Sequence, residues 1–464
     1  MRQDIRREFA FFHKNNNSVL YHIKTSNFYR VFDSILVEKF KKYFHETAVD
    51  EDVFNKLYQL EKSQEENCDV DQKAIQKSNK FVLNRLALVL TSDCNLRCTY
   101  CYANFGMYGY REKNIMSEKS LERTIDYFTK KFKKINAIQF FGGEPTLCEN
   151  QIKYVVEKFA ILKEQKNIDY TPSYGLVTNG VRISEQLMEI FKKYNFVITL
   201  SVDGPRQIHD SVRRDLAKRG SFDIIKNNYE KMKKIGIEKI AIESTYTNEH
   251  VKQGVSLVDV VNFCADHFGD NTPHVVPVAI DEENELSLAK SLQQFETYLV
   301  ELVNYTFKTL LEGRKVKSTA IVAGLIQKII LKQHSKVICP AGGSTLSVSN
   351  DMTIQPCFMY TSEDSTAFGN LDSSGDELLE KAYTFNEKIN NKRHVAKCQE
   401  CFMRSICTSC LGDFQKDDDC LKNTNQVTCS AIRIIGESIL LNISEIKADE
   451  HKWKRLHCAI NGVN

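Results

Sequence analysis

The sequence lacks three features that would direct it to a nucleic acid, a secretory route or a membrane. Its 63 Lys and Arg residues nearly balance its 60 Asp and Glu residues, and a net charge of +3 gives no global field that would attract a polyanion. The first residues are charged and no apolar segment follows them, so we expect no signal peptide. The most apolar run, 321–331, is too short to span a membrane and contains Lys328.

Cysteine, in contrast, is abundant. Fifteen cysteines in a chain with no expected signal peptide favour metal ligation over disulfides, and they indicate a protein of the reducing cytoplasm. With 464 residues the chain is long enough for two or three domains and a full α/β core.

The most informative motif is a group of three cysteines with the spacing Cys-x3-Cys-x2-Cys, formed by Cys94, Cys98 and Cys101. Residues 81–91 before it are apolar and end in a polar turn, which predicts a buried strand. The three thiolates would then leave the carboxyl end of a strand, where α/β barrels carry their chemistry. A [4Fe–4S] cluster usually has four cysteine ligands, so three would leave one iron open. A zinc knuckle or three core thiols are the alternatives.

This motif resembles that of the radical S-adenosylmethionine (SAM) superfamily, in which an aromatic residue, here Tyr100, precedes the third cysteine. The resemblance implies that SAM chelates the open iron and is cleaved to methionine and a 5′-deoxyadenosyl radical. That radical takes a hydrogen atom from the substrate, so Cys94, Cys98 and Cys101 would be the catalytic cluster ligands.

The middle of the chain alternates short apolar strands with amphipathic helices, which is typical of repeated β-α units and a parallel sheet. Six such units suit the partial (β/α)6 barrel of the radical SAM superfamily. We expect strands at 81–90, 137–141, 174–178, 197–202, 240–246 and 274–280, and helices at 117–132, 150–166, 184–194 and 221–235.

Several of these strands end in residues that resemble the superfamily's SAM-binding motifs. The run at 142–145 is Gly-Gly-Glu-Pro, in which glycines allow close approach of a backbone to a bound group and a carboxylate can pair with an ammonium. Arginine suits the SAM carboxylate because its planar fork binds bidentately. The resemblance implies SAM contacts from Tyr100, Gly142, Gly143, Glu144, Asn179, Ser201, Asp203 and Arg213.

Three features near these motifs have competing interpretations. Arg214 competes with Arg213 for the carboxylate, and the turn at 203–205 also reads as ordinary turn chemistry. A lone histidine after a strand, as His209 is, more often packs or caps than acts as a base.

The C-terminal third contains a second set of eight cysteines. Its dense core has two Cys-x2-Cys pairs five residues apart, whereas a zinc ribbon separates its pairs by roughly 15–20 residues. The stretch resembles the SPASM domain, which implies two auxiliary [4Fe–4S] clusters. By that resemblance one cluster uses Cys339, Cys357 and Cys410, and the other uses Cys398, Cys401, Cys407 and Cys429.

The ligand set of the first auxiliary cluster stays open at this point. Either Cys420 completes it, or one of its iron atoms is free to bind a substrate thiolate. The remaining cysteines, Cys68, Cys148, Cys264 and Cys458, are scattered, and we expect them to be structural or free.

Four domains follow from these patterns: a small module at 1–79, the barrel at 80–283, a helical bridge at 284–335 and the SPASM domain at 336–464. In the first, strands at 19–23 and 28–32 form a hairpin signal, helices are expected at 33–44 and 51–61, and a polar linker at 62–80 follows. The module resembles the winged-helix-like modules that hold a leader peptide as an added strand. A plain cap on the barrel is the alternative.

Together these resemblances imply a cytoplasmic radical SAM/SPASM enzyme that forms thioether bonds in a ribosomally made precursor peptide, as in sactipeptides or ranthipeptides. Its partners would be that peptide and an external electron donor such as flavodoxin or ferredoxin. Alternatives are a carbon–carbon crosslinking maturase, an anaerobic sulfatase (formylglycine) maturase and a non-catalytic iron–sulfur electron carrier. A sulfatase maturase is expected to have an aspartate directly after the cysteine aligned with Cys357, where this chain has Phe358, and to start almost at the cluster motif, whereas Cys94 lies far along this chain.

Overall fold

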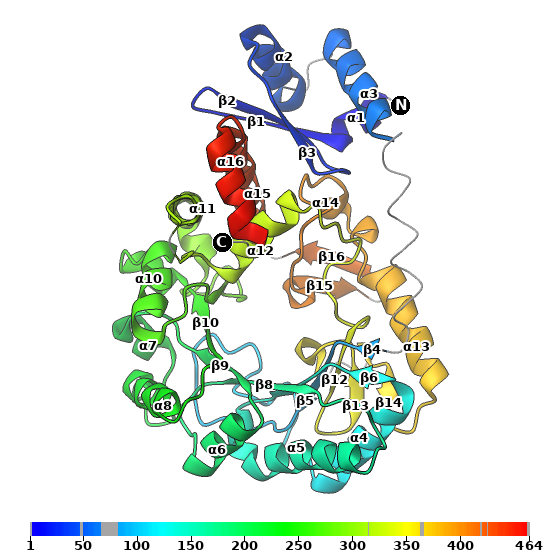
Figure 1. Ribbon diagram of the computed structural model, residues 1–464, viewed down its shortest axis with the longest axis vertical. Coiled ribbons are helices and arrows are strands. Elements are labelled where there is room, and N and C mark those ends of the chain that lie inside the picture. Colours follow the sequence, from blue (N-terminus) through cyan, green and yellow to red (C-terminus); the bar gives the residue numbers. More distant parts are fainter. Residues whose placement is uncertain are drawn as a thin grey trace.

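The computed structural model describes residues 2–46, 50–65, 82–313, 315–361, 366–417, 420–424 and 426–461. A curved, mostly parallel sheet with helices on its outer side forms the largest part (Figure 1). A small three-stranded sheet with its own helices lies at the N-terminus, against the long helix of residues 426–447.

Six parallel strands form the barrel, as the β-α alternation predicts. They are β5 (Arg85–Val89), β7 (Ala137–Phe141), β8 (Ser173–Thr178), β9 (Val197–Ser201), β10 (Ile240–Tyr246) and β11 (His274–Pro277). Each pairs in parallel with the next, so their carboxyl ends meet at one edge. A short parallel pair, β4 (Val82–Leu83) and β6 (Lys134–Ile135), precedes β5 and β7. The predicted partial barrel is confirmed.

Helices that cover this sheet begin at polar caps and bury one apolar face. The Ser117 and Ser184 side chains accept hydrogen bonds from backbone amides in the first turns of α4 and α6, and Ser256 forms a capping box at α10. The helices of the barrel are α4 (Glu118–Lys131), α5 (Glu149–Glu164), α6 (Glu185–Lys193), α7 (Arg206–Val212), α8 (Phe222–Lys234), α9 (Asn248–Lys252) and α10 (Leu257–Phe268).

The C-terminal segment extends the barrel sheet on its other side. Strand β12 (Thr345–Val348) pairs in parallel with β5, and β13 (Thr353–Gln355) and β14 (Gly369–Asn370) follow in antiparallel pairing. The sheet order is therefore β11-β10-β9-β8-β7-β5-β12-β13-β14. Strand β5, which leads into the first three cysteines, lies inside the sheet between β7 and β12. The expected domain boundary at 336 thus separates two segments of sequence that share one sheet.

The N-terminal module consists of α1 (Arg2–Glu8), β1 (Phe9–Lys14), β2 (Asn17–His22), β3 (Asn27–Arg30), α2 (Ser34–His45) and α3 (Glu51–Glu65). The predicted hairpin is found as β2 and β3, and the predicted helices as α2 and α3. Strand β1 was not expected. It pairs with β2, so β2 is the central strand of the sheet β1-β2-β3 and β3 is an edge strand. The predicted linker at 62–80 lies largely outside the described residues, since α3 continues to Glu65.

Two long helices connect the barrel with the N-terminal module. Helix α11 (Leu292–Leu311) packs against α15 (Gln426–Lys447), and α15 also contacts β2. Helices α12 (Ala320–Ile330) and α16 (Glu450–Asn461) lie beside them. The cysteine-rich region adds α13 (Gly375–Thr384), α14 (Ala396–Gln399), β15 (Phe414–Asp417) and β16 (Cys420–Thr424).

Helix α15 corrects the expectation that the segment 321–331 is the most membrane-like part of the chain. By length and composition α15 could cross a membrane, with a mean hydropathy of 1.3. However, 61% of that window is buried inside the protein, against α11 and the N-terminal sheet. We therefore interpret α15 as a core helix.

Candidate functional site

The first three cysteines lie on the loop after β5, at the carboxyl edge of the barrel. Cys94, Cys98 and Cys101 are each half-buried and free. Burial, with further contributions from the Glu144 carboxylate and the Cys98 and Cys101 thiols, raises the pKa of the Cys94 thiol to about 12. A buried thiolate of this kind is stable only beside a cation, and the iron atoms of a cluster supply such a charge. The donor set fits an iron–sulfur cluster.

Glycines bring the loop after β7 against this cysteine loop. Gly142 has φ +139°, and a Cβ atom there would lie 2.6 Å from the Thr91 carbonyl oxygen. Gly106 has φ +94°, and its Cβ would lie 2.6 Å from the Cα of Gly143. The Gly143 amide donates to the Thr91 carbonyl at 2.9 Å. Glycine is required here because two backbones meet without room for side chains.

Glu144 holds the ends of two strands together. Its side chain is 1% exposed, and Oε1 accepts from the Thr178 hydroxyl at 2.6 Å and from the Thr146 amide at 3.0 Å. Its Oε2 accepts from the Asn179 amide at 2.7 Å, while burial raises the pKa of the carboxyl group. The carboxylate thus already has protein donors, and a contact with an ammonium group would come in addition to them.

Asn179 connects the third strand to the cysteine loop. Its side-chain amide donates to the Asn95 Oδ1 atom at 2.7 Å and reaches the Cys94 sulfur at 3.7 Å. Ser201, another predicted SAM contact, is the last residue of β9 and is half-buried. The structure therefore places these predicted residues at the same edge of the barrel as the cysteines.

A buried chain of hydrogen bonds links Tyr100, Asp203 and Arg213. The Tyr100 hydroxyl donates to Asp203 Oδ2 at 2.5 Å and accepts from Arg213 Nη1 at 2.6 Å. Arg213 is 7% exposed. Burial raises the pKa of Cys98, and the charge of Arg213 opposes that rise.

The Arg213 Nε–H group is buried and has no hydrogen-bond partner among the described residues. A buried donor of this kind fits a carboxylate ligand such as that of SAM. Arg214 donates from Nε to the Asp210 carbonyl and lies outside this chain of bonds, so the geometry favours Arg213.

Two buried histidines fix the loop that contains Asp203. The Asp203 amide donates to His209 Nδ1 at 3.3 Å, and the opposite ring nitrogen of His209 donates to the Ser221 hydroxyl at 2.9 Å. His250 donates from Nε2 to the Asp203 carbonyl at 2.6 Å. Burial lowers the pKa of His209 to about 4, so the ring is neutral. His209 packs as expected, whereas His250 was missed because nothing near it in sequence resembles a motif.

Four of the C-terminal cysteines come together as one group, which we call the second auxiliary group: Cys398, Cys401, Cys407 and Cys429. The pKa of Cys407 is raised to about 12, first by burial and then by the neighbouring thiols of this group. Cys398 shows the same pattern, with a pKa of about 11. The four are the cysteines that the SPASM resemblance assigns to one cluster, and that assignment stays a prediction.

Cys339, Cys357 and Cys410, which we call the first auxiliary group, lie beside the cysteine loop of the barrel. Burial together with the Cys357 thiol raises the pKa of Cys339, and the backbone of Leu411, the residue after Cys410, opposes that rise. Tyr102 and Tyr108 interact with both Cys101 and Cys357. These two tyrosines, whose ring centroids are 6.1 Å apart, therefore lie near thiols of both sets.

The remaining cysteines have different surroundings. Cys148 and Cys264 are buried, and Cys458 is exposed. Cys420 lies on β16, but its side chain and all of Cys68 fall outside the described residues. In the part of the chain that the structure describes, no three His, Cys, Asp or Glu side chains converge as ligands of a single metal ion do. An iron–sulfur cluster needs no such convergence, because each of its thiolates binds a different iron atom.

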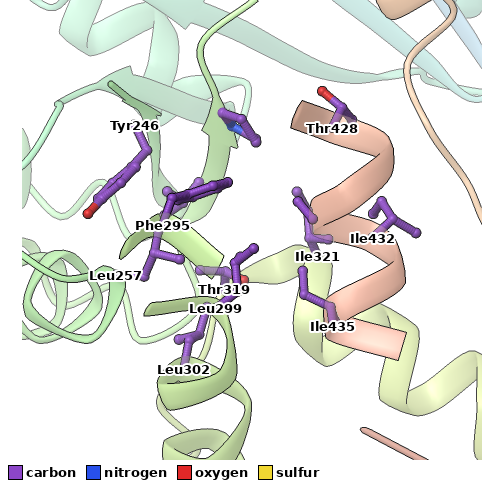
Figure 2. A pocket seen from close by; sticks show the side chains of 13 residues that line it. Tyr246, Leu257, Phe295, Leu299, Leu302, Thr319, Ile321, Thr428, Ile432 and Ile435 are labelled. Carbon is purple, nitrogen blue, oxygen red and sulfur yellow. The ribbon is translucent and has the colours of Figure 1, made fainter. Parts of the chain in front are cut away.

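A separate apolar cavity lies between the barrel, α11, α12 and the start of α15 (Figure 2). Tyr246, Phe295, Thr428 and Ile432 are among the residues that line it. The Tyr246 hydroxyl donates to the Val255 carbonyl and points away from the other lining side chains. With this almost wholly hydrocarbon lining, the cavity has no group for acid–base or metal chemistry.

Comparisons with known proteins agree with this geometry. Residues 88–259 match the Radical SAM superfamily. The chain is 27% identical over 334 residues to the cysteine-type anaerobic sulfatase-maturating enzyme of Clostridium novyi (strain NT), a match that covers 70% of this chain and 87% of that enzyme. It is 31% identical over 166 residues to the radical SAM cyclopropyl synthase TigE of Paramaledivibacter caminithermalis, covering 32% of this chain and 33% of that protein.

Solved structures show the same fold. Native anSMEcpe with bound AdoMet superposes with a TM-score of 0.64 at 22% identity, covering 82% of this chain and 100% of that one. The same protein with bound AdoMet and the Cp18Cys peptide gives 0.63 at 23% identity, covering 78% and 99%. Residues 88–259 of this chain are therefore a radical SAM domain, of a superfamily that uses a [4Fe–4S] cluster and S-adenosylmethionine.

Proposed function

We propose that this enzyme forms thioether bonds in a ribosomally made precursor peptide in the cytoplasm, joining a cysteine sulfur to a carbon of another residue. The observation that carries the proposal is the position of Cys357 beside the radical cysteine loop. The next residue, Phe358, stacks on Phe141 and packs in the same small apolar cluster as Cys101. A substrate sulfur held at the first auxiliary group would lie close to the site where hydrogen is removed.

The cofactors proposed for this reaction are the barrel [4Fe–4S] cluster, SAM and two auxiliary [4Fe–4S] clusters. When bound, the first two supply a carbon radical that abstracts hydrogen. The residues of the chain would hold them: Cys94, Cys98 and Cys101 bind iron, and Gly142, Gly143 and Arg213 surround the methionine end of SAM. Tyr100, Glu144, Asn179, Ser201 and Asp203 complete that pocket.

The overall change balances as a two-electron oxidation of the peptide. The acceptor carbon loses a hydrogen atom, which leaves as part of 5′-deoxyadenosine. The cysteine thiol would lose a proton as the carbon–sulfur bond forms, and the remaining electron would leave to an acceptor held by the auxiliary cysteines. An external donor such as flavodoxin or ferredoxin supplies the electron that starts each turnover.

The N-terminal module is proposed to hold the leader of the peptide. Strand β3 is an edge strand, so its outer backbone groups are available to an added strand. Large apolar side chains next to it, Phe32 and Ile35, are 78% and 70% exposed. Exposed apolar side chains beside a free strand edge suit an extended peptide with alternating apolar residues.

A second candidate is a formylglycine-forming enzyme, which the similarity to the Clostridium novyi enzyme favours. Against it, the residue after Cys357 is Phe358, which is stacked on Phe141 and has no proton to exchange. A carbon–carbon bond-forming maturase is a third candidate, which the similarity over 166 residues to the cyclopropyl synthase TigE favours.

The test is an anaerobic reaction with the cluster-loaded enzyme, reductant, SAM and a cysteine-containing precursor peptide encoded beside the gene, followed by mass spectrometry. Thioether formation predicts 5′-deoxyadenosine, a loss of two hydrogens per crosslink and cysteines that no longer alkylate without any disulfide. Formylglycine would appear as an aldehyde that reacts with hydrazine, and a carbon–carbon bond as a loss of two hydrogens with alkylatable cysteines. A Cys98→Ala enzyme, which lacks one cluster ligand, is the control and should give no deoxyadenosine.

A further inference from the structure

A buried lysine lies at the second auxiliary group. Lys392 is 6% exposed, and its ammonium group donates to the backbone carbonyls of Ser335 at 2.8 Å and Arg404 at 3.0 Å. Burial lowers the pKa of Lys392 to about 8, and the nearby thiols of Cys407, Cys398 and Cys401 oppose that decrease. Lysine is rarely buried to this degree unless it faces a compensating negative charge.

The carbonyl partners of Lys392 hold it in place but do not neutralise it. A carbonyl oxygen accepts a hydrogen bond without carrying a formal charge, so the compensating charge must come from elsewhere. Its charged neighbours are the cysteines of the second auxiliary group and a second cation, Lys328. The positive charge of Lys328 lowers the pKa of Lys392 further. Thiolates that ligate iron would supply the missing negative charge.

Local structure fixes the distance between the lysine and the cysteines. Lys392 opens the short helix Lys392–His394, which leads directly into α14, where Cys398 lies. The Cys398 amide donates to the Val395 carbonyl, and the Val395 amide donates to the Lys392 carbonyl. The lysine and the first ligand of the group are therefore joined by consecutive turns of one segment.

Further cations surround the same thiols. Lys328 donates to the Thr408 hydroxyl at 2.8 Å, next to Cys407, and Arg433 and Arg404 oppose the rise that burial causes in the pKa of Cys401. Of these, Arg404 is paired with Glu8 at 2.9 Å, whereas Lys392 has no carboxylate partner among the described residues. At the first auxiliary group, Arg85 has the same effect on the pKa of both Cys339 and Cys357.

We propose that Lys392 is a fixed internal cation that raises the reduction potential of the second auxiliary cluster. This cluster would therefore be the acceptor of the electron that the substrate releases. A [4Fe–4S] cluster with four thiolate ligands is negatively charged, and reduction adds a further negative charge. A buried cation stabilises the reduced state more than the oxidised state, and in a medium of low polarity the effect is strong. Lys392 touches neither substrate nor SAM, so it is a positioning residue for charge.

The proposal rests on the second auxiliary cluster of the proposed function, and it does not depend on which bond the enzyme forms. The test is a redox titration of the cluster-loaded enzyme, without substrate, followed by electron paramagnetic resonance. Lys392→Met removes the charge and keeps most of the side-chain volume. Lys397→Met is the matched control, because Lys397 precedes Cys398 but is exposed to solvent.

In Lys392→Met the midpoint potential of the second auxiliary cluster should become more negative, with the other two clusters unchanged. Lys392→Arg, which keeps the charge, should stay close to the original enzyme, and Lys397→Met should show little shift because water screens its charge. An unchanged potential in Lys392→Met with full iron content would overturn the proposal, as would an equal shift in Lys397→Met.

A second variant covers the case in which Lys392→Met does not hold the cluster. Lys328→Met removes a cation that donates to a side chain beside Cys407, and it should lower the same potential by a smaller amount. If it leaves the potential unchanged, the proposal fails. If the original enzyme binds iron for only one cluster, it is the auxiliary clusters of the proposed function that are wrong, a result that iron and sulfide analysis identifies before any titration.

Discussion

The ring of Phe358 stacks on the ring of Phe141, with centroids 3.8 Å apart and an angle of 29° between the planes. Phe141 is the last residue of β7, just before Gly142, and Phe358 directly follows Cys357. The stack therefore joins the glycine loop proposed for SAM to a proposed ligand of the first auxiliary cluster. It is an apolar contact at a position where a sulfatase maturase is expected to carry an acid.

Substitutions at Phe358 should separate the thioether and formylglycine candidates. Phe358→Leu keeps an apolar contact, loses roughly 1 kcal/mol of aromatic stacking and should leave the yield of crosslinked peptide within about threefold. Phe358→Asp brings a carboxylate against the Phe141 ring and should lower the yield more than about tenfold. Mass spectrometry of the peptide is the measurement. The appearance of formylglycine with Phe358→Asp would instead favour the second candidate.

Gly143→Ala should prevent assembly of the barrel cluster. Its Cβ would collide with the backbone of Asp93, directly before Cys94, and a backbone cannot move aside as a side chain can. We expect the variant to fold and to lose the iron and sulfide of one cluster, together with SAM cleavage. Gly324→Ala is the control, since a Cβ at Gly324 in α12 meets no atom within 4 Å. Equal iron content in the two variants would refute the close approach of the two loops.

The buried, neutral His209 should make the folded protein less stable in acid. Its pKa is about 4 in the folded state, against 6.5 for a histidine exposed to water. Between these pH values the histidine is protonated in the unfolded state and neutral in the folded state. The contribution of His209 to the free energy of unfolding is complete above pH 6.5. It decreases as the pH falls towards 4, by at most roughly 3 kcal/mol.

The check is the pH dependence of urea unfolding of the enzyme and of His209→Gln. Gln can still donate to Ser221, but it does not titrate, so the slope between pH 6.5 and 4 should be shallower in the variant. His22, whose pKa burial also lowers to about 4, leaves some slope in both proteins. Parallel curves would mean that His209 takes up its proton without unfolding.

Alkylation should reveal whether Cys410 is a cluster ligand. Cys410 and Cys458 are both exposed in the structure, so both should react quickly with iodoacetamide in the protein without iron. In the cluster-loaded enzyme Cys410 should be protected at least about tenfold, whereas Cys458 should react as before. Peptide mapping gives both rates in one sample. Equal reactivity of Cys410 with and without iron would remove it from the first auxiliary group.

The outer edge of β3 should be required for binding of the leader. The Val31 amide donates to the Ser18 carbonyl on β2, so by alternation the Arg30 amide points away from β2. Arg30→Pro removes this outward donor and should weaken leader binding at least about tenfold, and Arg30→Ala should keep it. Fluorescence anisotropy with a labelled leader peptide is the measurement. Equal affinities would favour the module as a plain cap on the barrel.

Much of the barrel could be predicted from sequence because its signals are local. Alternating apolar residues and polar caps such as Ser117 and Ser184 placed the strands and helices within a few residues of their observed ends. Pairing of β12 with β5 was not foreseen, because the two strands lie far apart in the chain and no local pattern encodes their register. Strand β1 was missed because its run of phenylalanines lacks the alternation of a half-exposed strand.

In the functional site, too, local features could be predicted from the sequence and contacts between distant segments could not. The three barrel cysteines and the grouping of the second auxiliary cysteines follow from spacing and resemblance. Within each set the thiols are close enough to raise one another's pKa, and their roles as cluster ligands stay predictions. The roles of Glu144 and His250 depend on hydrogen bonds between distant segments, so a motif could name the first and could not indicate the second. Lys392 stood out in no pattern, since a lysine near cysteines in sequence is ordinarily a solvent-exposed residue.

The N-terminal module packs against the loop between Cys401 and Cys407. The Ser405 hydroxyl donates to the Ile23 carbonyl at 2.5 Å, Phe402 packs edge-on against Phe12, and Arg404 pairs with Glu8. Deleting residues 2–65 would therefore uncover a cluster loop as well as remove the proposed leader site. A truncated enzyme that fails cannot tell the two losses apart, so the module is best dissected by single substitutions at its outer edge. Grafting a foreign module would likewise need to reproduce these three contacts.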